Sequence, residues 1–273
     1  MEKPYKIVAL DLDGTLLDER GEITENNLCA LQRAREAGII VLIATGRMLV
    51  SALPYYEKLK LKAPIITYNG ALIKDVSADK IMAHHPVSLK QARSIIRDTQ
   101  QKGLHLNLYL DDRLFVKEHT PESRGYEKDT GTQARAVGSL LDFLDRPPTK
   151  LLVIERDRDR FVRLLQYYQK QFGSELKITE SKKHYLEFGD LRATKGLALS
   201  SAADYLGVDC RQVMAVGDAL NDLSMIKWAG CGVTVKGASS QIKEEADFII
   251  PDPENDGIAY LIDRYILASH SRE

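Results

Sequence analysis

The chain has 273 residues, of which 44% are hydrophobic, and its 38 basic residues almost balance its 39 acidic residues. Such a composition is typical of a globular protein with one large domain or two moderate ones. The charges are spread along the chain with no basic stripe and no acidic tail, which argues against a nucleic-acid partner.

The cysteines and the apolar runs indicate the compartment. Cys29, Cys210 and Cys231 are far apart and odd in number, which predicts free thiols in a reducing environment rather than disulfides or a zinc site. Residues 1–6 lack the apolar core of a signal peptide, and the longest apolar run, residues 38–44, is too short to span a bilayer. We therefore expect a cytoplasmic protein with no membrane partner.

The first predicted strand, residues 7–10, is a short apolar run. It ends in Asp11-Leu12-Asp13-Gly14, so two carboxylates stand where the strand stops and the chain turns. An ordinary Asp-Gly turn is one interpretation. The other is a functional pair, because carboxylates crowded at the carboxyl end of a strand repel each other and need a cation or a catalytic role. A helix that Thr24 caps and Gly38 ends follows this turn.

Two further strands also end in small or polar turns. The continuous apolar run over residues 39–44 predicts a strand covered on both faces, and Thr45-Gly46-Arg47 follows it. After a helical stretch that Pro54 interrupts, a strand over residues 64–68 ends in Asn69-Gly70. Alternating strands and helices predict a parallel sheet, which would bring these turns to one edge.

From about residue 84 the pattern changes to a helix followed by paired strands, and this order occurs twice. The expected elements are a helix over 88–103, strands over 104–110 and 114–118 joined as a hairpin, a strand over 150–155, a helix over 161–172, and strands over 176–179 and 184–188. We expect residues 120–138 to be less regular. The segment is predicted to be an inserted α+β module with an antiparallel sheet.

The alternating pattern returns at Thr194. The expected elements are helices over 194–206, 223–228, 239–246 and 258–267, and strands over 213–216, 231–235 and 248–250. The predicted fold class is α/β, with a Rossmann-like parallel-sheet core formed by residues 1–83 and 189–273. An α+β domain is predicted as an insertion at residues 84–188.

A second cluster of oxygen-bearing side chains follows the strand over 213–216. It comprises Asp218, Asn221 and Asp222. A helix start explains one of them, because Asp and Asn favour the first helical turn. Two acidic turns at one sheet edge, without paired His and Cys, favour a hard cation such as Mg²⁺, which prefers oxygen ligands and substrate phosphate.

Three other residues offer donors for an anion. Lys195 opens a helix, where the helix dipole disfavours a cation unless a bound anion shares that helix end. Thr45 supplies a hydroxyl and Gly46 exposes backbone amides. A solvated surface lysine and a simple strand-end cap are the alternatives. Together with a carboxylate nucleophile and a cation, these donors predict phosphoryl transfer.

Four segments occur in the order of a known set of motifs. They are Asp11-Leu12-Asp13-Gly14-Thr15, Ala44-Thr45-Gly46-Arg47, Lys195-Gly196 and Gly217-Asp218-Ala219-Leu220-Asn221-Asp222. In this order they resemble the haloacid dehalogenase (HAD) superfamily. The Asn69-Gly70 turn and the long insert are similar to its Cof-type phosphatases, which carry an α/β (type IIB) cap. The resemblance covers essentially the whole chain.

The resemblance implies a role for each motif residue. Asp11 would be the nucleophile, and Asp13 would protonate the leaving oxygen and then activate water. The phosphoryl oxygens would be bound by Thr45, Gly46, Lys195 and Asn221. The cofactor Mg²⁺ would be held by Asp11, Asp13 (through its backbone carbonyl), Asp218 and Asp222.

The implied activity is Mg²⁺-dependent hydrolysis of a small phosphorylated metabolite through an aspartyl-phosphate, the substrate being a sugar phosphate or a flavin- or vitamin-related phosphate. A phosphomutase and a catalytically idle metabolite-binding protein stay open as alternatives. We expect a monomer or homodimer. By analogy the cap supplies specificity, although surface or turn roles explain its candidate contacts equally well. These are Arg47, Asn69, Tyr109, Asp111, Arg124, His184 and Tyr185.

Overall fold

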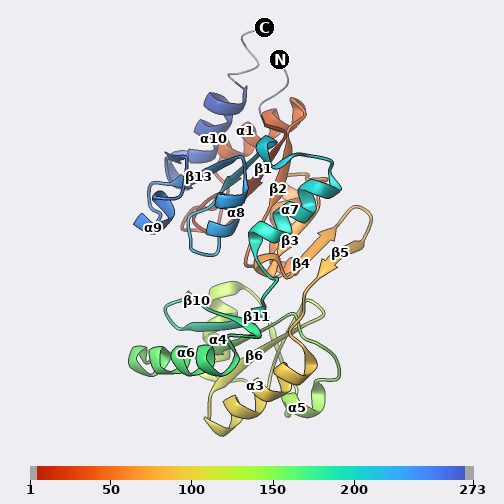
Figure 1. The fold of residues 1–273 in the computed structure, drawn as a ribbon, viewed down its shortest axis with the longest axis vertical. Coiled ribbons are helices and arrows are strands. Elements are labelled where there is room, and N and C mark those ends of the chain that lie inside the picture. Colours follow the sequence, from red (N-terminus) through yellow and green to blue (C-terminus); the bar gives the residue numbers. More distant parts are fainter. Residues whose placement is uncertain (1–4, 268–273) are drawn as a thin grey trace. The chain divides into compact units, whose positions relative to one another are not determined.

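The computed structural model describes residues 5–267, without the side chain of Lys182, and divides the chain into two compact units. The first unit comprises the described residues up to Arg47, residues 52–83 and those from Thr194 onward, and the second comprises residues 48–51 and 84–193. In Figure 1 the insertion at 84–193 is coloured yellow to green. The expectation for the chain start lies outside the described residues at positions 1–4.

A parallel sheet of five strands forms the centre of the first unit, as predicted. In spatial order the strands are β14 (Phe248–Ile250), β13 (Cys231–Val235), β12 (Val213–Val216), β1 (Ile7–Leu10) and β2 (Ile40–Ile43). The register places Leu10 of β1 beside Ile43 of β2 and Val216 of β12. The segments that follow these three strands therefore start side by side at the carboxyl edge of the sheet.

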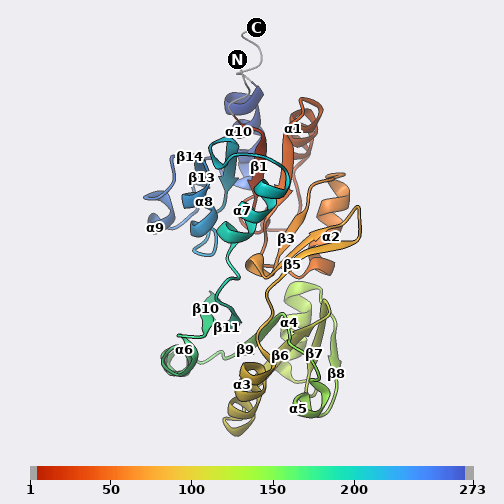
Figure 2. The same ribbon diagram turned by 45° about the vertical axis from the view of Figure 1, so that its right-hand side comes forward.

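Helices cover both faces of this sheet, because its central strands are continuous apolar runs that are buried throughout. α7 and α8 pack on the face that carries Ile7 and Ala9, and α1 and α10 lie together on the other face (Figures 1 and 2). The helices of this part of the chain are α1 (Glu25–Glu36), α2 (Leu49–Lys58), α7 (Lys195–Tyr205), α8 (Leu223–Trp228), α9 (Ser240–Lys243) and α10 (Gly257–Leu261), the last continued by a π-helix (Ile262–Leu267).

The helix α2 and the strand β3 (Ile65–Thr67) differ from the sequence prediction. An interruption was expected at Pro54, but α2 continues through it. The proline has no backbone N–H and so removes one hydrogen bond from the helix, while the residues on either side of it remain helical. β3 forms a separate three-stranded sheet with β4 (Leu72–Asp75) and β5 (Lys80–His84), two strands that were not predicted. β5 has no buried residue, so its sequence carries no strong apolar signal.

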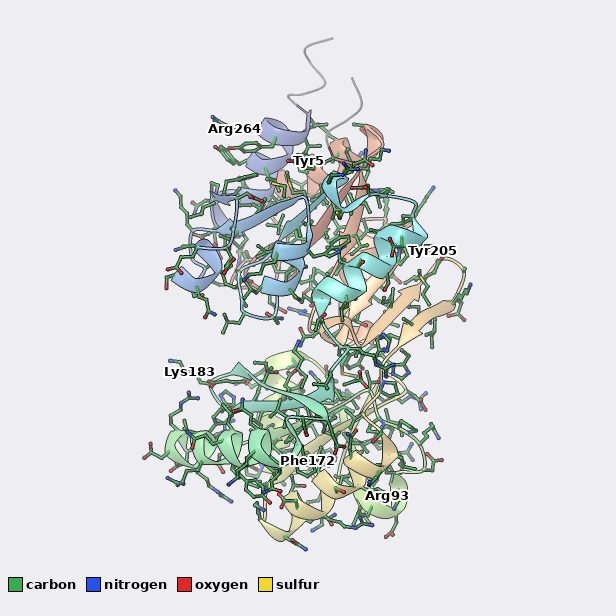
Figure 3. All side chains as sticks on the ribbon, viewed as in Figure 1. Tyr5, Arg93, Phe172, Lys183, Tyr205 and Arg264 are labelled. Carbon is green, nitrogen blue, oxygen red and sulfur yellow. The ribbon has the colours of Figure 1, made fainter. Side chains whose placement is uncertain are left out.

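A six-stranded sheet forms the second unit. Its order is β10 (Leu176–Lys182), β11 (Tyr185–Asp190), β9 (Lys150–Ile154), β6 (His105–Leu110), β7 (Arg113–Val116) and β8 (Ala134–Ala136). Neighbouring strands are antiparallel except β7 and β8, which confirms the predicted type of sheet. Its apolar core includes residues of α3 (Leu89–Gln101) and α6 (Arg158–Phe172), and Phe172 packs against it (Figure 3).

Residues 120–138 are more regular than predicted. Thr120 and Ser123 form a capping box at the start of α4 (Pro121–Thr130), and β8 follows. The short helix α5 (Leu140–Phe143) comes next. The expectation of an irregular stretch was wrong because α4 buries only Ser123 and Tyr126, and so shows no apolar periodicity.

The state of the cysteines and the character of the helices follow from the structure. All three cysteines are free, as expected; Cys29 and Cys210 are exposed and Cys231 is buried. Within residues 5–267, no helix combines the length and the apolar character needed to cross a membrane.

Candidate active site

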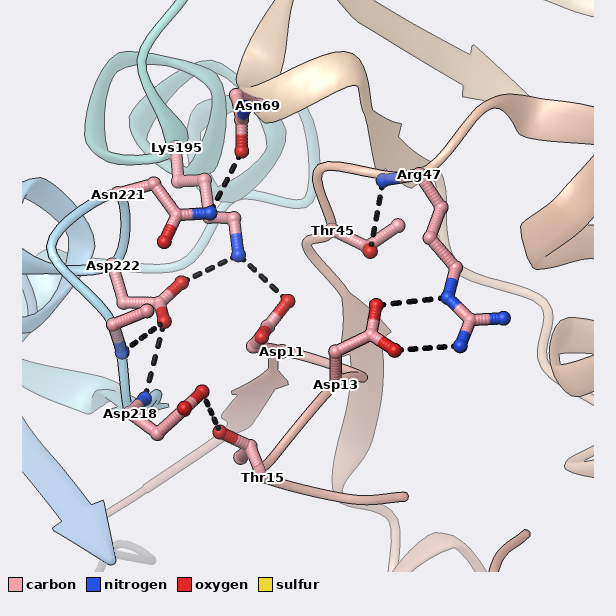
Figure 4. A network of polar contacts seen from close by, with 11 residues as sticks. Asp11, Asp13, Thr15, Thr45, Arg47, Asn69, Lys195, Asp218, Asn221 and Asp222 are labelled. Carbon is pink, nitrogen blue, oxygen red and sulfur yellow. Dashed lines mark hydrogen bonds and ion pairs between the residues drawn. The ribbon is translucent and has the colours of Figure 1, made fainter. Parts of the chain in front are cut away.

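Three loops meet at the carboxyl edge of the parallel sheet, and they carry most of the predicted site residues (Figure 4). Two main-chain bonds show how close they are: Asp11 N–H donates to the carbonyl of Val216 at 3.0 Å, and Ala44 N–H donates to that of Leu10 at 2.9 Å. The loops after β1, β12 and β2 therefore start from directly bonded neighbours. This explains how residues more than 200 positions apart in the chain come together, as in the contact of Thr15 with Asp218.

Lys195 lies at the centre of this site and is completely buried. It is the first residue of α7, which Thr194 caps. Its Nζ donates to Oδ1 of Asp11 at 2.7 Å and to Oδ1 of Asp222 at 2.5 Å. Burial alone would lower the pKa of Lys195, but the two carboxylates raise it above its usual value, so the ammonium stays charged. This burial excludes the alternative of a solvated surface lysine.

Three carboxylates surround the space beside Lys195. Asp11, Asp218 and Asp222 each place an oxygen within 4.8 Å of the others. Burial, together with the charge of Asp222, raises the pKa of Asp11 well above its usual value, although Lys195 partly opposes this rise. The same two causes raise the pKa of Asp218 to about 6. Burial is the main cause of both shifts, and the neighbouring carboxylate of Asp222 adds to each.

This donor set fits Mg²⁺, which binds carboxylate oxygens and other hard ligands. The buried acidic group contains no nitrogen or sulfur donor of the kind that favours zinc. Gly14 helps to keep the group compact. It has a positive φ of 77°, and a Cβ at its position would lie 2.6 Å from Oδ2 of Asp218. Glycine at this position therefore lets the loop after β1 take its left-handed conformation and approach Asp218 without displacing that side chain.

Both carboxylate oxygens of Asp222 are already engaged. Oδ1 accepts from Lys195, and Oδ2 accepts from the backbone N–H groups of Asp218 at 3.1 Å and Ala219 at 3.0 Å. Asp222 thereby holds the lysine and closes the loop that presents Asp218. Thr15 adds a further bond, since its hydroxyl donates to Oδ1 of Asp218 at 3.1 Å.

Asp13 lies apart from the acidic group. Its carboxylate, 62% exposed, accepts two hydrogen bonds from Arg47, from Nε at 2.8 Å and from Nη2 at 2.6 Å. Nη1 of Arg47 donates to the hydroxyl of Tyr55 at 3.2 Å, and the guanidinium carbon lies 5.1 Å from the centre of the Tyr55 ring. Arg47, expected to contact the substrate, is thus bound to the predicted acid and base.

The loop after β2 contains Thr45 and Gly46. Thr45 is buried, and its hydroxyl oxygen accepts from the backbone N–H of Arg47 at 3.2 Å, as a strand-end cap would. The Asn69 turn lies against this loop, with Asn69 N–H donating to the Thr45 carbonyl at 3.0 Å. Asn221 reaches the same turn through a 2.8 Å bond from its Nδ2 to Oδ1 of Asn69. All these residues belong to the first unit.

The other predicted cap contacts belong to the second unit. Tyr109 is completely buried, and its hydroxyl donates to that of Tyr126 at 2.7 Å. Asp111 lies in the hairpin turn between β6 and β7 and forms an ion pair with Arg146, which favours the turn interpretation. Arg124 is an exposed residue of α4, and the rings of His184 and Tyr185 pack on each other with centroids 4.2 Å apart.

Sequence reasoning gave no role to Thr15 or Tyr55. Thr15 follows the Asp13-Gly14 turn directly, so its position in the motif was an available signal. Tyr55 lies inside α2, and its contact with Arg47 depends on how that helix packs. Its spacing from the motifs could not have revealed it.

Comparison with known proteins agrees with this geometry. The profile of the haloacid dehalogenase-like hydrolases matches residues 8–262. A Bacillus subtilis protein named 5-amino-6-(5-phospho-D-ribitylamino)uracil phosphatase YitU is 30% identical over 96% of this chain and 98% of its own length. Pyridoxal phosphate phosphatase YbhA of Escherichia coli is 28% identical over 96% of this chain and 99% of its own.

Solved structures show the same fold. A haloacid dehalogenase-like hydrolase from Bacteroides thetaiotaomicron superposes with a TM-score of 0.88 at 26% identity, over 95% of this chain and 99% of that one. TM0651 from Thermotoga maritima superposes with a TM-score of 0.86 at 28% identity, over 95% of this chain and 97% of that one. The chain belongs to the haloacid dehalogenase-like hydrolases, the superfamily that its four motifs predicted, and it is a phosphatase of the Cof type.

Proposed function

We propose that this phosphatase hydrolyses the monoester of a small phosphorylated metabolite with Mg²⁺, through an aspartyl-phosphate on Asp11. The buried contact of Lys195 with Asp11 and Asp222, beside Asp218, carries the proposal. A buried lysine that binds a carboxylate at a sheet edge keeps that carboxylate in a fixed orientation. Such fixed charges are the main requirement of phosphoryl transfer.

In the first step, one carboxylate oxygen of Asp11 attacks phosphorus, and the bond from phosphorus to the leaving oxygen breaks. Lys195 holds Oδ1 of Asp11, which orients the second oxygen. Asp13, which enters this step as the protonated acid, gives its proton to the leaving oxygen, so the product leaves as an alcohol. Asp13 then takes a proton from water as that water attacks phosphorus, which releases inorganic phosphate and regenerates Asp11.

Mg²⁺ would be held by Asp11 and Asp218, with Asp222 and the backbone carbonyl of Asp13 beside it. When bound, the ion neutralises the negative charge of the acidic group and of the phosphoryl oxygens. Burial and the charge of Asp222 raise the pKa of Asp218 to about 6, and a cation bound beside Asp218 would oppose this rise, which supports the proposed site. Thr45, Gly46, Lys195 and Asn221 are the proposed donors to the phosphoryl oxygens.

The relatives support a small metabolite as the substrate. The two relatives described above are named as phosphatases of a phosphoribitylamino-uracil and of pyridoxal phosphate. Each of these two substrates combines a phosphate ester with a nitrogen heterocycle. We therefore propose a vitamin- or flavin-related phosphate or a sugar phosphate for this chain. Membership of the family leaves the leaving group open, because identity to these relatives is 30% or less.

A panel of phosphorylated metabolites, scored by release of inorganic phosphate, tests the proposal. The wild type with Mg²⁺ should hydrolyse at least one monoester without a bisphosphate activator, and excess chelator should abolish the activity until Mg²⁺ is restored. Asp11→Asn should lose at least about 10³-fold in turnover. The control Asp204→Asn, on the exposed side of α7, should retain it. Full activity in chelator, or in Asp11→Asn, contradicts the mechanism.

A further inference from the structure

The turn at Asn69 is bonded to the loop after β2 at two points. Tyr68 N–H donates to the Arg47 carbonyl at 2.9 Å, and Asn69 N–H donates to the Thr45 carbonyl at 3.0 Å. Tyr68 and Asn69 both have positive φ, 52° and 58°. A non-glycine residue in the left-handed region is uncommon, although asparagine tolerates it better than most. Two consecutive residues of this kind indicate a turn whose shape is imposed by its contacts.

The side chain of Asn69 reaches the opposite loop (Figure 4). Its Oδ1 accepts from Nδ2 of Asn221 at 2.8 Å, across 152 positions in the sequence. Gly46 makes room for this side chain, because a Cβ at its position would lie 2.8 Å from Oδ1 of Asn69. Asn69 therefore connects the loop after β2, which carries Thr45 and Gly46, with the loop after β12, which carries Asn221.

This bond also couples the orientation of the Asn221 amide to that of the Asn69 amide. The nitrogen of an amide carries two hydrogens, and Asn69 accepts one of them. The second hydrogen stays available for an acceptor beside it. If the Asn221 amide alone turned over, its oxygen would face Oδ1 of Asn69, and two acceptors would repel each other. Asn69 thus holds Asn221 with its donor end in place.

We propose that Asn69 is a positioning residue for phosphoryl binding, which orients the Asn221 amide and keeps the loops after β2 and β12 in register. The inference rests on the proposed function, since it assigns Asn221 a phosphoryl oxygen as its ligand. It replaces the direct substrate contact that the sequence suggested for Asn69. A positioning residue must affect every monoester equally, whereas a contact with the leaving group must distinguish them.

Asn69→Gly is the informative variant, because glycine adopts the left-handed conformation of this turn and removes the side chain that carries the amide. Its matched control is Lys60→Gly, at an exposed position of the same unit with φ of 49°. We expect Asn69→Gly to lower kcat/KM by the same factor, about 10-fold, for three monoesters with different leaving groups. Lys60→Gly should stay within about 2-fold of the wild type. An effect of Asn69→Gly that differs more than about 10-fold between the monoesters, or no effect, overturns the inference.

A double-mutant cycle tests whether Asn69 acts through Asn221. Asn69→Gly should cost less than about 2-fold when Asn221 is already Ala, and fully additive losses contradict the inference. Binding of inorganic phosphate with Mg²⁺, measured by calorimetry, is a readout that does not need turnover. Asn69→Gly should weaken it about 10-fold, and unchanged binding overturns the inference. If the wild type hydrolyses no monoester, the proposed function fails, and this phosphate-binding comparison still decides the role of Asn69.

Discussion

Arg47 binds both carboxylate oxygens of Asp13, at 2.6 and 2.8 Å, while Tyr55 supports the same guanidinium. In this arrangement the proposed acid and base is directed to Arg47, outside the group formed by Asp11, Asp218 and Asp222. A bidentate pair fixes the orientation of a carboxylate more firmly than a single hydrogen bond does. Arg47 therefore helps to fix the orientation of the Asp13 carboxylate.

Replacement of Arg47 should affect catalysis much more than stability. Because the Asp13 side chain is 62% exposed, loss of the pair in Arg47→Ala should cost less than about 1 kcal/mol in the free energy of unfolding. We expect kcat/KM to fall about 10- to 100-fold, because the acid and base loses its fixed orientation. Arg47→Lys, which keeps the charge but not the paired donors, should recover only part of the loss. Steady-state kinetics and urea unfolding measure the two effects, and a wild-type kcat/KM in Arg47→Ala would show that the pair has no catalytic role.

Asp13→Asn should separate the two chemical steps. The amide keeps the shape of Asp13 but can neither give a proton to the leaving oxygen nor take one from water. With a monoester whose leaving group departs without protonation, Asp11 should still be phosphorylated and the phosphate should accumulate on it. Rapid-quench labelling with a ³²P-labelled monoester should show a stable labelled protein, and Asp11→Asn/Asp13→Asn should remain unlabelled. Breakdown of the labelled species at the wild-type rate would exclude Asp13 as the base.

Lys195→Met should destabilise the protein strongly. The variant leaves Asp11 and Asp222 buried without their shared cation, a loss of about 3–5 kcal/mol. Mg²⁺ should raise the melting temperature of this variant more than that of the wild type, because the ion replaces the missing positive charge. The matched control is Lys150→Met, which removes a buried lysine paired with Glu187 at 3.1 Å in the second unit. It should also destabilise the protein, but without the added response to Mg²⁺. An equal response in both variants would contradict the assignment.

The raised pKa of Asp218 predicts a pH dependence in chelator. An unfolded Asp loses its proton near pH 4, whereas the folded protein keeps the Asp218 proton to about pH 6. Between these values the native state binds more protons than the unfolded state. The contribution of Asp218 to the free energy of unfolding is therefore fully present below pH 4 and is lost as the pH rises through 6. Thermal unfolding from pH 4 to 7 should show this loss in the wild type and less of it in Asp218→Asn. Identical profiles would place the responsible group elsewhere.

The loops of the candidate active site could be predicted from the sequence because the signals for them are local. Each follows an apolar strand, and parallel strands bring their carboxyl ends to one edge. The Lys195 contacts with Asp11 and Asp222 agree with that placement. The pair between Asp13 and Arg47 could not be predicted, since it depends on side-chain orientation and on Tyr55, which α2 supplies.

Two other features escaped prediction for different physical reasons. α4 has its helical signal in the capping box of Thr120 and Ser123 rather than in apolar spacing. β5 is stabilised by its neighbour β4 and buries none of its own residues, so its backbone pairing leaves no pattern in the sequence.

The pairing of β1 with β12 has a consequence for how the protein folds. These neighbours at the centre of the sheet are separated in sequence by more than 200 residues, and the insertion at 84–193 lies between them. Contacts of such long range form slowly, whereas the hairpins of the insertion are local. During synthesis, the inserted unit can complete its sheet before β12 has emerged. We therefore expect the candidate active site to be among the last parts of the molecule to assemble.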